Sequence, residues 1–161
     1  MSKKKKKVAP GTFVTNRRAL RNYVVLETFE AGIALVGTEV KSIREGHVSI
    51  EEAFAMVDNS QLWLHQLHIE VYSFGNRNNH TPVRLKRLLM HKAEIRRLAA
   101  KTAEKGLALV PMRIYEKNRL IKVELGLCKG KNVVDKRETI KKRESERDAS
   151  RAINEARKNQ L

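Results

Sequence analysis

Short runs of branched and aromatic residues, each bounded by turn-forming residues, occupy the middle of the chain and predict β-strands. The first run covers residues 23–29, and Glu30-Ala31-Gly32 after it is a predicted turn. The return strand is predicted for residues 33–36 and, after a bulge or bend at Gly37, for residues 38–44. Two further hairpins are predicted, one joining residues 53–57 to 61–67 and one joining 107–115 to 120–127.

Helical periodicity is strongest in residues 91–105, where apolar side chains recur at helical spacing between Ile95 and Thr102. A short helix is predicted for residues 16–22 and a single helical turn for residues 49–52. About six short strands with one substantial helix indicate a mostly β fold, for which a small antiparallel OB-like barrel is the natural candidate.

The net charge of the chain indicates the class of partner that it binds. The chain has 161 residues with 34 Lys and Arg against 18 Asp and Glu, so its formal net charge is +16. Such an excess indicates an anionic partner, with nucleic acid ahead of a membrane surface. Residues 1–21 hold eight basic and no acidic residues, and residues 129–161 hold eleven basic and six acidic ones. We therefore expect a flexible basic arm (1–15), a barrel (16–128) and a basic tail (129–161) that is disordered alone.

Signals for catalysis are weak, and we expect no enzyme, no cofactor and no metal. Cys128 is the single cysteine, which excludes an internal disulfide or a cysteine zinc cluster and suits a reducing cytoplasm. His65 and His68 fall in a strand-like run, where residues three apart point to opposite faces. No phosphate-binding glycine loop is present, and the N-terminal lysines precede no apolar run of the kind that a signal peptide has. No stretch approaches the length of a membrane-spanning helix.

A basic cluster follows the polar loop at residues 74–82. Arg84, Lys86 and Arg87 are either a solvated face or a set of phosphate contacts, and the net charge favours phosphate. Aromatic residues make up only 5% of the chain, and we expect Trp63 and Phe54 in the core. The protein is therefore expected to recognise the shape of RNA more than a run of unstacked bases.

The tail contains the signals of a helix that needs a partner. Asp135 and Glu138 match a capping box, with Asp135 as the N-cap. Arg143, Arg147 and Arg151 are four residues apart, so they share one face of the helix that would follow. Their repulsion disfavours the isolated helix, whereas a polyanion would favour it. We therefore expect this helix to form only when the tail is bound.

Several motifs in a fixed order resemble the SmpB family, the bacterial proteins that bind the transfer-messenger RNA called SsrA. They are EAGIAL at residues 30–35, GTEVKSIR at 37–44, Arg84 with RLLMHK at 87–92, KGK at 129–131 and DKRE at 135–138. The resemblance extends from about residue 16 to residue 151.

The resemblance implies an adaptor of trans-translation. Its barrel would bind the tRNA-like part of transfer-messenger RNA, and its tail would enter the vacant mRNA path of a stalled ribosome, in the decoding region of the small subunit. Elongation factor Tu would join through the RNA complex. We expect a cytoplasmic monomer that uses no membrane. The alternative is a general binder of structured RNA, such as a ribosome-associated OB protein.

The family's RNA-contact positions correspond to Glu30, Leu89 and His91, although Leu89 beside Leu88 is equally compatible with a core position. With the basic residues added, the expected RNA-binding residues are Glu30, Lys41, Arg44, Arg84, Arg87, Leu89 and His91. The expected ribosome-binding residues of the tail are Gly130, Lys131, Asp135, Lys136, Arg137, Arg143, Arg147, Arg151 and Ile153. The chain departs from the family at Val134, where an aromatic ring or His is usual, so it lacks a stack worth about 1–3 kcal/mol there.

Overall fold

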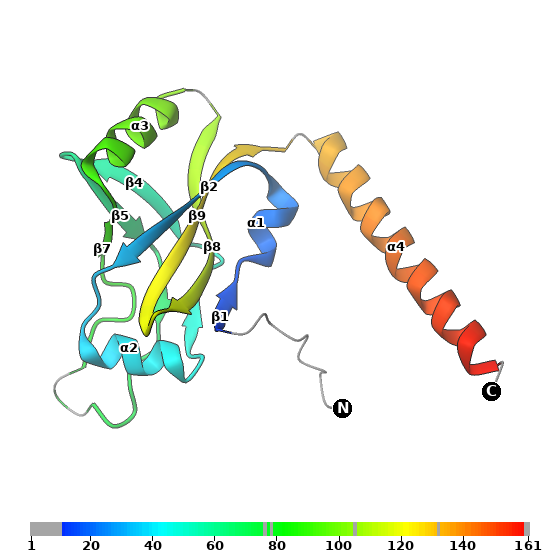
Figure 1. Ribbon diagram of the computed structural model, residues 1–161, viewed down its shortest axis with the longest axis horizontal. Helices are drawn as coiled ribbons and strands as arrows, with labels where there is room; N and C mark the ends of the chain where they lie inside the picture. The colour runs from blue at the N-terminus through cyan, green and yellow to red at the C-terminus, as the bar shows by residue number, and fades with distance from the viewer. Residues whose placement is uncertain (1–10, 76, 78, 105, 132, 160–161) are drawn as a thin grey trace.

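The computed structural model describes residues 11–75, 77, 79–104, 106–131 and 133–159 (Figure 1). The helices are α1 (Arg17–Asn22), α2 (Gly37–Arg44), α3 (Lys92–Thr102) and α4 (Val133–Asn159). The strands of the main sheet are β1 (Thr12–Thr15), β2 (Tyr23–Ile33), β4 (Phe54–Asp58), β5 (Gln61–His65), β7 (Lys86–Leu89), β8 (Leu107–Lys117) and β9 (Leu120–Gly130). Two short strands, β3 (Val48–Ser49) and β6 (His68–Ile69), pair separately.

The main sheet closes on itself as an antiparallel barrel. Its strand order is β1-β8-β4-β5-β7-β2-β9, and β8 also pairs with β9. Two junctions of this ring are sparse. The strands β4 and β8 share the single pair Ala55↔Leu109, and β2 and β7 share only Gly32↔Leu89 and Ile33↔Leu88. In the ring order these two junctions lie on opposite sides of the barrel.

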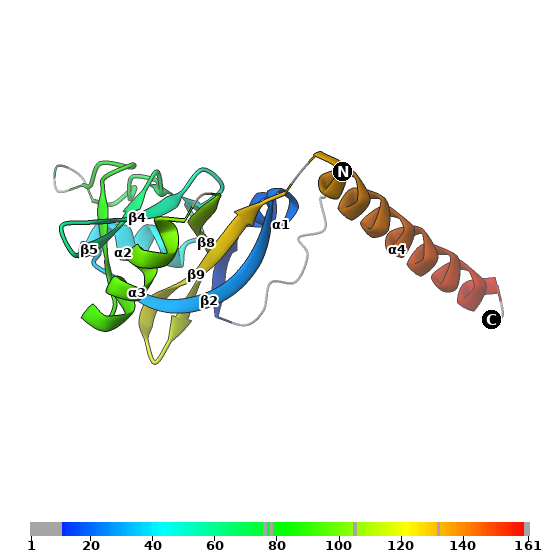
Figure 2. The same cartoon turned by 90° about the horizontal axis from the view of Figure 1, so that it is seen from above.

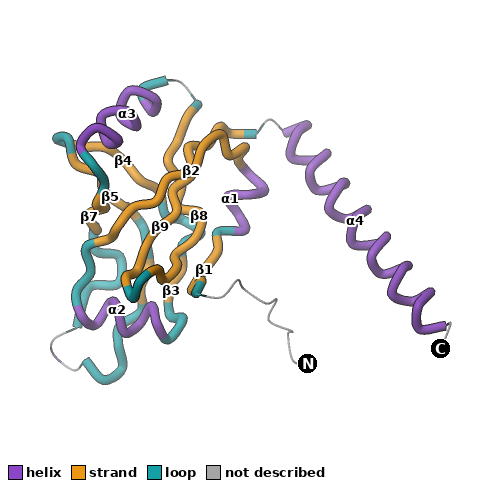
Figure 3. Tube along the Cα trace, in the orientation of Figure 1, coloured by secondary structure: helices purple, strands orange, loops and turns teal. Residues whose placement is uncertain are grey.

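The barrel interior is filled by alternate residues of the strands, as the period of a strand requires. Leu62 and Leu64 of β5 are fully buried, as are Ile114 of β8 and Leu125 of β9. The helix α3 adds Ile95 and Leu98 to this core and covers one end of the barrel (Figure 3). The apolar stripe predicted for this helix is therefore what attaches it to the sheet.

A smaller core lies beneath α1. Ala19 packs there with Val110, Met112 and Cys128, and Tyr23 is partly buried against them. Burial raises the pKa of the Cys128 thiol to about 11. This second core joins α1 to the strands from which the tail departs.

The sequence predictions for α1, α3 and both later hairpins are confirmed, but two local predictions are wrong and a third is displaced by one residue. Residues 30–32 are no turn, because β2 continues to Ile33. The predicted strand at 38–44 is the helix α2, whose buried residues Glu39, Ser42 and Ile43 have helical spacing. The turn predicted at 49–52 lies one residue later: Ser49 pairs with His68 in β3, and the Ala53 N–H donates to the Ile50 carbonyl at 3.1 Å.

The tail forms α4, a helix of 27 residues that leaves the barrel beside α1 and extends away from it (Figures 1 and 2). The helix begins at Val133, two residues before the predicted N-cap. Its expected dependence on a partner concerns the free chain in solution and stays a prediction. None of the described helices is long and apolar enough to cross a membrane. The lysine run at residues 3–7 lies outside the described residues, whereas Thr12–Thr15, assigned by sequence to the arm, belong to the sheet as β1.

Candidate nucleic-acid interface

A cleft of about 660 Å³ opens at the sparse junction between β2 and β7. We call it the β2–β7 cleft. It is lined by Thr28, Phe29, Glu30, Gly32, Leu89, Met90, His91, Glu94 and Lys122. Glu30, Leu89 and His91, which the family resemblance selects as RNA contacts, therefore lie around one cleft although they come from different elements.

Glu30 projects from β2 and is held by two donors. The Tyr115 hydroxyl of β8 donates to its carboxylate, and Lys117 Nζ lies 3.2 and 3.3 Å from its two oxygens. The hydrogen bond from Tyr115, followed by the one from Lys117, lowers the pKa of Glu30 below its ordinary value of 4.5. The carboxylate is thus ionised and fixed, and it keeps lone pairs for ribose hydroxyls or base amino groups.

The hydrogen bond to Glu30 also affects the pKa of Tyr115. Burial, followed by its hydrogen bond to Glu30, raises the pKa of the phenol well above 10. The Arg113 guanidinium lies 4.3 Å from the centre of the Tyr115 ring and pairs with Glu124. Glu124 is the cross-strand neighbour of Glu30, so Arg113 offsets the repulsion between the two carboxylates.

Lys122 is a cleft residue that sequence reasoning missed. It lies on β9 opposite Gly32 of β2, and its charge contributes to the lowered pKa of Glu30. One lysine among many in a basic chain carries no distinguishing signal in the sequence. Its role depends on the register of β9 against β2, and this register becomes visible only in the structure.

Leu88 lies in the core, whereas its neighbour Leu89 lies at the surface. The side chain of Leu88 is 1% exposed, whereas that of Leu89 is 49% exposed. The position opposite Leu89 is Gly32, and a Cβ there would lie 3.2 Å from Leu89 Cβ. The glycine therefore leaves room for an exposed leucine at the cleft wall, and the core interpretation of Leu89 is wrong.

His91 is exposed at the N-cap of α3, with its backbone in an extended conformation. The backbone N–H of His91 donates to the Glu94 carboxylate over 3.3 Å. This contact satisfies a backbone donor at the helix start and fixes the direction in which the chain enters α3. The imidazole remains on the surface at the end of the cleft.

The basic cluster at the start of β7 divides into a buried lysine and two arginines that are at least partly exposed. Lys86 is fully buried and donates to the carbonyls of Leu67 (3.1 Å) and Arg84 (2.7 Å), so its interpretation as a phosphate contact is wrong. Burial lowers the pKa of Lys86, although the nearby Glu39 opposes this effect. Arg84 binds the buried Glu39 carboxylate at 2.5 Å, whereas Arg87 is exposed on β7.

The two cations proposed on α2 already have partners at the surface. Lys41 Nζ lies 5.4 Å from the centre of the Tyr72 ring. Arg44 pairs with Glu116 at 2.6 Å and donates to the Arg119 carbonyl at 3.4 Å. Neither residue lines the β2–β7 cleft, nor do Arg84 and Arg87. These four cations therefore lie outside the cleft, where each is at least partly exposed.

The base of the tail is attached to α1. Gly130 pairs with Tyr23, and the Lys131 N–H donates to the Asn22 carbonyl at 3.0 Å. Lys131 Nζ and the Arg143 guanidinium both donate to the Leu20 carbonyl, each over 3.3 Å. Cations at this position satisfy an orphan carbonyl at the C-terminal end of α1.

From Glu144 to Asn159 the side chains of α4 are exposed to solvent. Arg143, Arg147 and Arg151 line one side of α4, with Arg151 lying 3.9 Å from Asp148. Arg137 and Ile153 are exposed, and Asp135 and Lys136 lie in the first turns of the helix. The described part of the tail thus presents a basic face to any partner along the helix.

Comparisons with known proteins show which family the chain is similar to. The profile of the SmpB protein family matches residues 13–155. An SsrA-binding protein of Pelotomaculum thermopropionicum is 56% identical over 140 residues, which cover 87% of this chain and 92% of that protein. An SsrA-binding protein of Levilactobacillus brevis is 50% identical over 154 residues, covering 95% of this chain and 98% of that protein. A solved structure described as "tmRNA-SmpB: a journey to the center of the bacterial ribosome" matches with a TM-score of 0.64 and 49% identity, covering 74% of this chain and 85% of that chain.

Proposed function

The chain belongs to the SmpB protein family, and from this membership we infer that it is an RNA-binding adaptor of trans-translation and not an enzyme. It binds transfer-messenger RNA and acts with it on the ribosome. The observation that carries the finer proposal is the β2–β7 cleft, where Glu30, Leu89 and His91 lie with Lys122. We assign the tRNA-like part of the RNA to this cleft.

Each residue of the cleft has a distinct chemistry to offer RNA. The ionised Glu30 accepts from ribose hydroxyls, which identify RNA independently of its sequence, or from base amino groups. Leu89 packs against a base or sugar face, and His91 stacks or donates. Lys122 contacts phosphate and offsets the repulsion between Glu30 and the RNA backbone. The exposed cations outside the cleft, which include Arg87, add affinity that depends on salt.

The tail is proposed to occupy the vacant mRNA path in the decoding region of the small subunit, in place of a missing codon–anticodon pairing. Support comes from the basic face of α4, formed by Arg143, Arg147 and Arg151, and from its extension away from the barrel. Asp135, Lys136 and Arg137 at the start of α4 are assigned to the same partner. We further propose that elongation factor Tu joins through the RNA, and that the protein works as a monomer in the cytoplasm.

The test is to sequence the RNA that co-purifies with the tagged full-length chain from a bacterial lysate at moderate salt. One dominant transfer-messenger RNA is the expected result, and it should be depleted in a Leu89→Ala variant. A broad mixture of ribosomal and other RNAs, unchanged by that variant, would instead support a general binder of structured RNA.

A further inference from the structure

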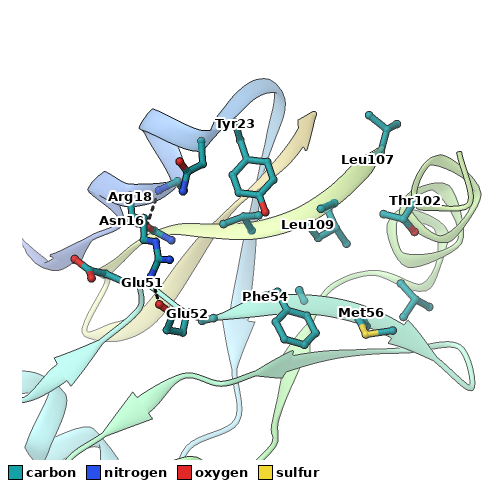
Figure 4. Close-up of a pocket in the computed structure, with 17 residues that line it drawn as sticks. Asn16, Arg18, Tyr23, Glu51, Glu52, Phe54, Met56, Thr102, Leu107 and Leu109 are labelled. Atoms are coloured by element: carbon teal, nitrogen blue, oxygen red, sulfur yellow. Dashed lines mark hydrogen bonds and ion pairs between the residues drawn. The ribbon is translucent and has the colours of Figure 1, made fainter. Parts of the chain in front are cut away.

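A second cleft lies across the barrel from the first, at the junction between β4 and β8. We call it the β4–β8 cleft. Its volume is about 520 Å³, and it is enclosed by β4, β8, α1 and the first residue of β2 (Figure 4). Clefts of about 300–1,000 Å³ are the size that receives small organic groups.

The cleft exists because the barrel is barely closed at this junction. On the edge that faces away from this junction, each strand is well paired: β4 pairs with β5, and β8 pairs with β9. Between them only Ala55 and Leu109 are paired, so the strands diverge on either side of that pair. Asn16 bridges part of this gap, because its Nδ2 donates to the carbonyls of Pro111 (3.0 Å) and Ile50 (3.3 Å).

Aromatic rings form the walls. Tyr23 lines the cleft beside α1, and Phe54 lines it on β4 (Figure 4). The Phe54 side chain is 38% exposed, so its predicted place in the core is wrong. Its ring stacks on His65 with centroids 5.0 Å apart and an interplanar angle of 4°. This backing fixes the orientation of the Phe54 ring and makes it a preformed flat surface.

The charged residues that line the cleft are Arg18, Glu51 and Glu52, and α1 carries two further arginines. Arg17, Arg18 and Arg21 are exposed on α1, which has no acidic residue. Arg18 pairs with Glu52 across one end of the cleft, and both side chains are at least half exposed. An ion pair of this kind is weak, so a phosphate can replace Glu52 at small cost. Flat aromatic walls beside a row of arginines are the features that bind single-stranded nucleic acid.

We propose that the β4–β8 cleft receives one unstacked base of ribosomal RNA. The base lies between Tyr23 and Phe54, and the phosphates beside it contact the arginines of α1. The ribosome is favoured over transfer-messenger RNA because α1 also holds the base of the tail, through Leu20, and the β2–β7 cleft is on the opposite side of the barrel. This inference rests on the proposed function, in which the tail enters the ribosome.

Photo-cross-linking of the full-length chain on stalled ribosomes identifies the occupant directly. The probe p-benzoylphenylalanine replaces Phe54, which keeps a ring in place. The matched control carries the same probe at Phe74, a 77% exposed ring outside the cleft. We expect the Phe54 probe to link to small-subunit RNA well above the Phe74 probe. Links chiefly to transfer-messenger RNA or to a ribosomal protein, or no excess over the control, would overturn the proposal.

A substitution then measures the contribution of stacking. Phe54→Leu keeps an apolar side chain but removes the flat ring, so affinity for stalled ribosomes should fall about 5- to 150-fold. Binding of the tRNA-like RNA and the thermal unfolding midpoint should be unchanged, and Phe74→Leu should alter none of these. Unchanged ribosome affinity in Phe54→Leu overturns this inference alone, whereas failure of the unsubstituted chain to bind transfer-messenger RNA overturns the proposed function.

Discussion

The Tyr115 hydroxyl donates a hydrogen bond to the Glu30 carboxylate, joining residues that lie 85 positions apart in the sequence. The contact crosses from β8 to β2 over β9, which lies between them in the sheet. Glu30 is therefore held in one orientation before any RNA arrives. Preorganisation of this kind reduces the entropic cost of binding.

Removing Glu30 should weaken RNA binding even though it removes a negative charge. Hydrogen bonds to an ionised group contribute about 1.5–3 kcal/mol, so Glu30→Ala should lower affinity for the tRNA-like RNA roughly 10-fold or more. The matched control is Glu27→Ala on the same strand, because Glu27 pairs with Lys101 and Arg97. Filter binding at fixed salt measures both. Tighter binding by Glu30→Ala would show that Glu30 only repels the RNA backbone.

Tyr115→Phe should change the acid response of Glu30. The hydrogen bond from Tyr115 is the main cause of the lowered Glu30 pKa, so its loss should move that pKa up toward 4.5. A carboxylate with a lowered folded-state pKa stabilises the fold above its unfolded-state pKa, and this stabilisation is lost as the pH falls through the folded-state value. Tyr115→Phe should therefore lose less stability on acidification than the unsubstituted chain.

The measurement is an NMR titration of the side-chain carboxyl groups, together with urea unfolding on both sides of pH 4.5. Glu27 provides the internal reference, because its pKa is lowered chiefly by Lys101. An unchanged titration of Glu30 in Tyr115→Phe would contradict the assigned cause. A shift of both carboxyl groups would indicate a general change of structure instead.

Leu88 and Leu89 should respond to the same substitution in opposite ways. Leu88→Ala leaves a cavity in the core and should lower the free energy of unfolding by about 2–5 kcal/mol. Leu89→Ala removes an exposed side chain and should change stability by only about 0.5 kcal/mol while weakening RNA binding. Denaturant unfolding gives the free energy of unfolding of both variants, and RNA titration gives their affinities. Equal loss of stability in the two variants would contradict the assignment.

The buried ion cluster should be sensitive to which charge is removed. Glu39→Gln leaves Arg84 and Lys86 without their carboxylate, and such a loss costs roughly 3–5 kcal/mol. Lys86→Met fills similar volume and leaves the contact between Glu39 and Arg84 intact, so it should cost less. Urea unfolding gives the order of the two midpoints. A Lys86→Met variant that is the less stable of the two would contradict this account.

Local patterns in the sequence predict much of the barrel, but they fail where distant contacts decide the structure. The hairpins and α3 follow from periodicity and turn residues. The helix α2 does not, because Thr38, Val40 and Ile43 favour a strand. Glu39 makes the difference, since its buried carboxylate meets Arg84 from 45 residues further along the chain. A contact of that kind is invisible to a local pattern.

In the candidate site, too, some residues could be predicted from the sequence and others only from the structure. The family motifs identify Glu30, Leu89 and His91, and the structure places them around one cleft. Lys122 and Tyr115 reach Glu30 only through the registers of β9 and β8, which carry no motif. Sequence reasoning therefore found the residues with a resemblance to support them and missed those that depend on strand register.

The tail and the barrel should separate functionally when the chain is cut after residue 132. The cut spares β9, which ends at Gly130, and the hydrogen bond from Lys131 to Asn22. It removes α4, whose attachment to the barrel includes the contact from Arg143 to the Leu20 carbonyl. The truncated chain should therefore bind the tRNA-like RNA with nearly full affinity but fail to support tagging of stalled peptides. Circular dichroism and thermal unfolding verify that the barrel remains folded, and normal tagging by the truncated chain would show that the decoding role assigned to the tail is wrong.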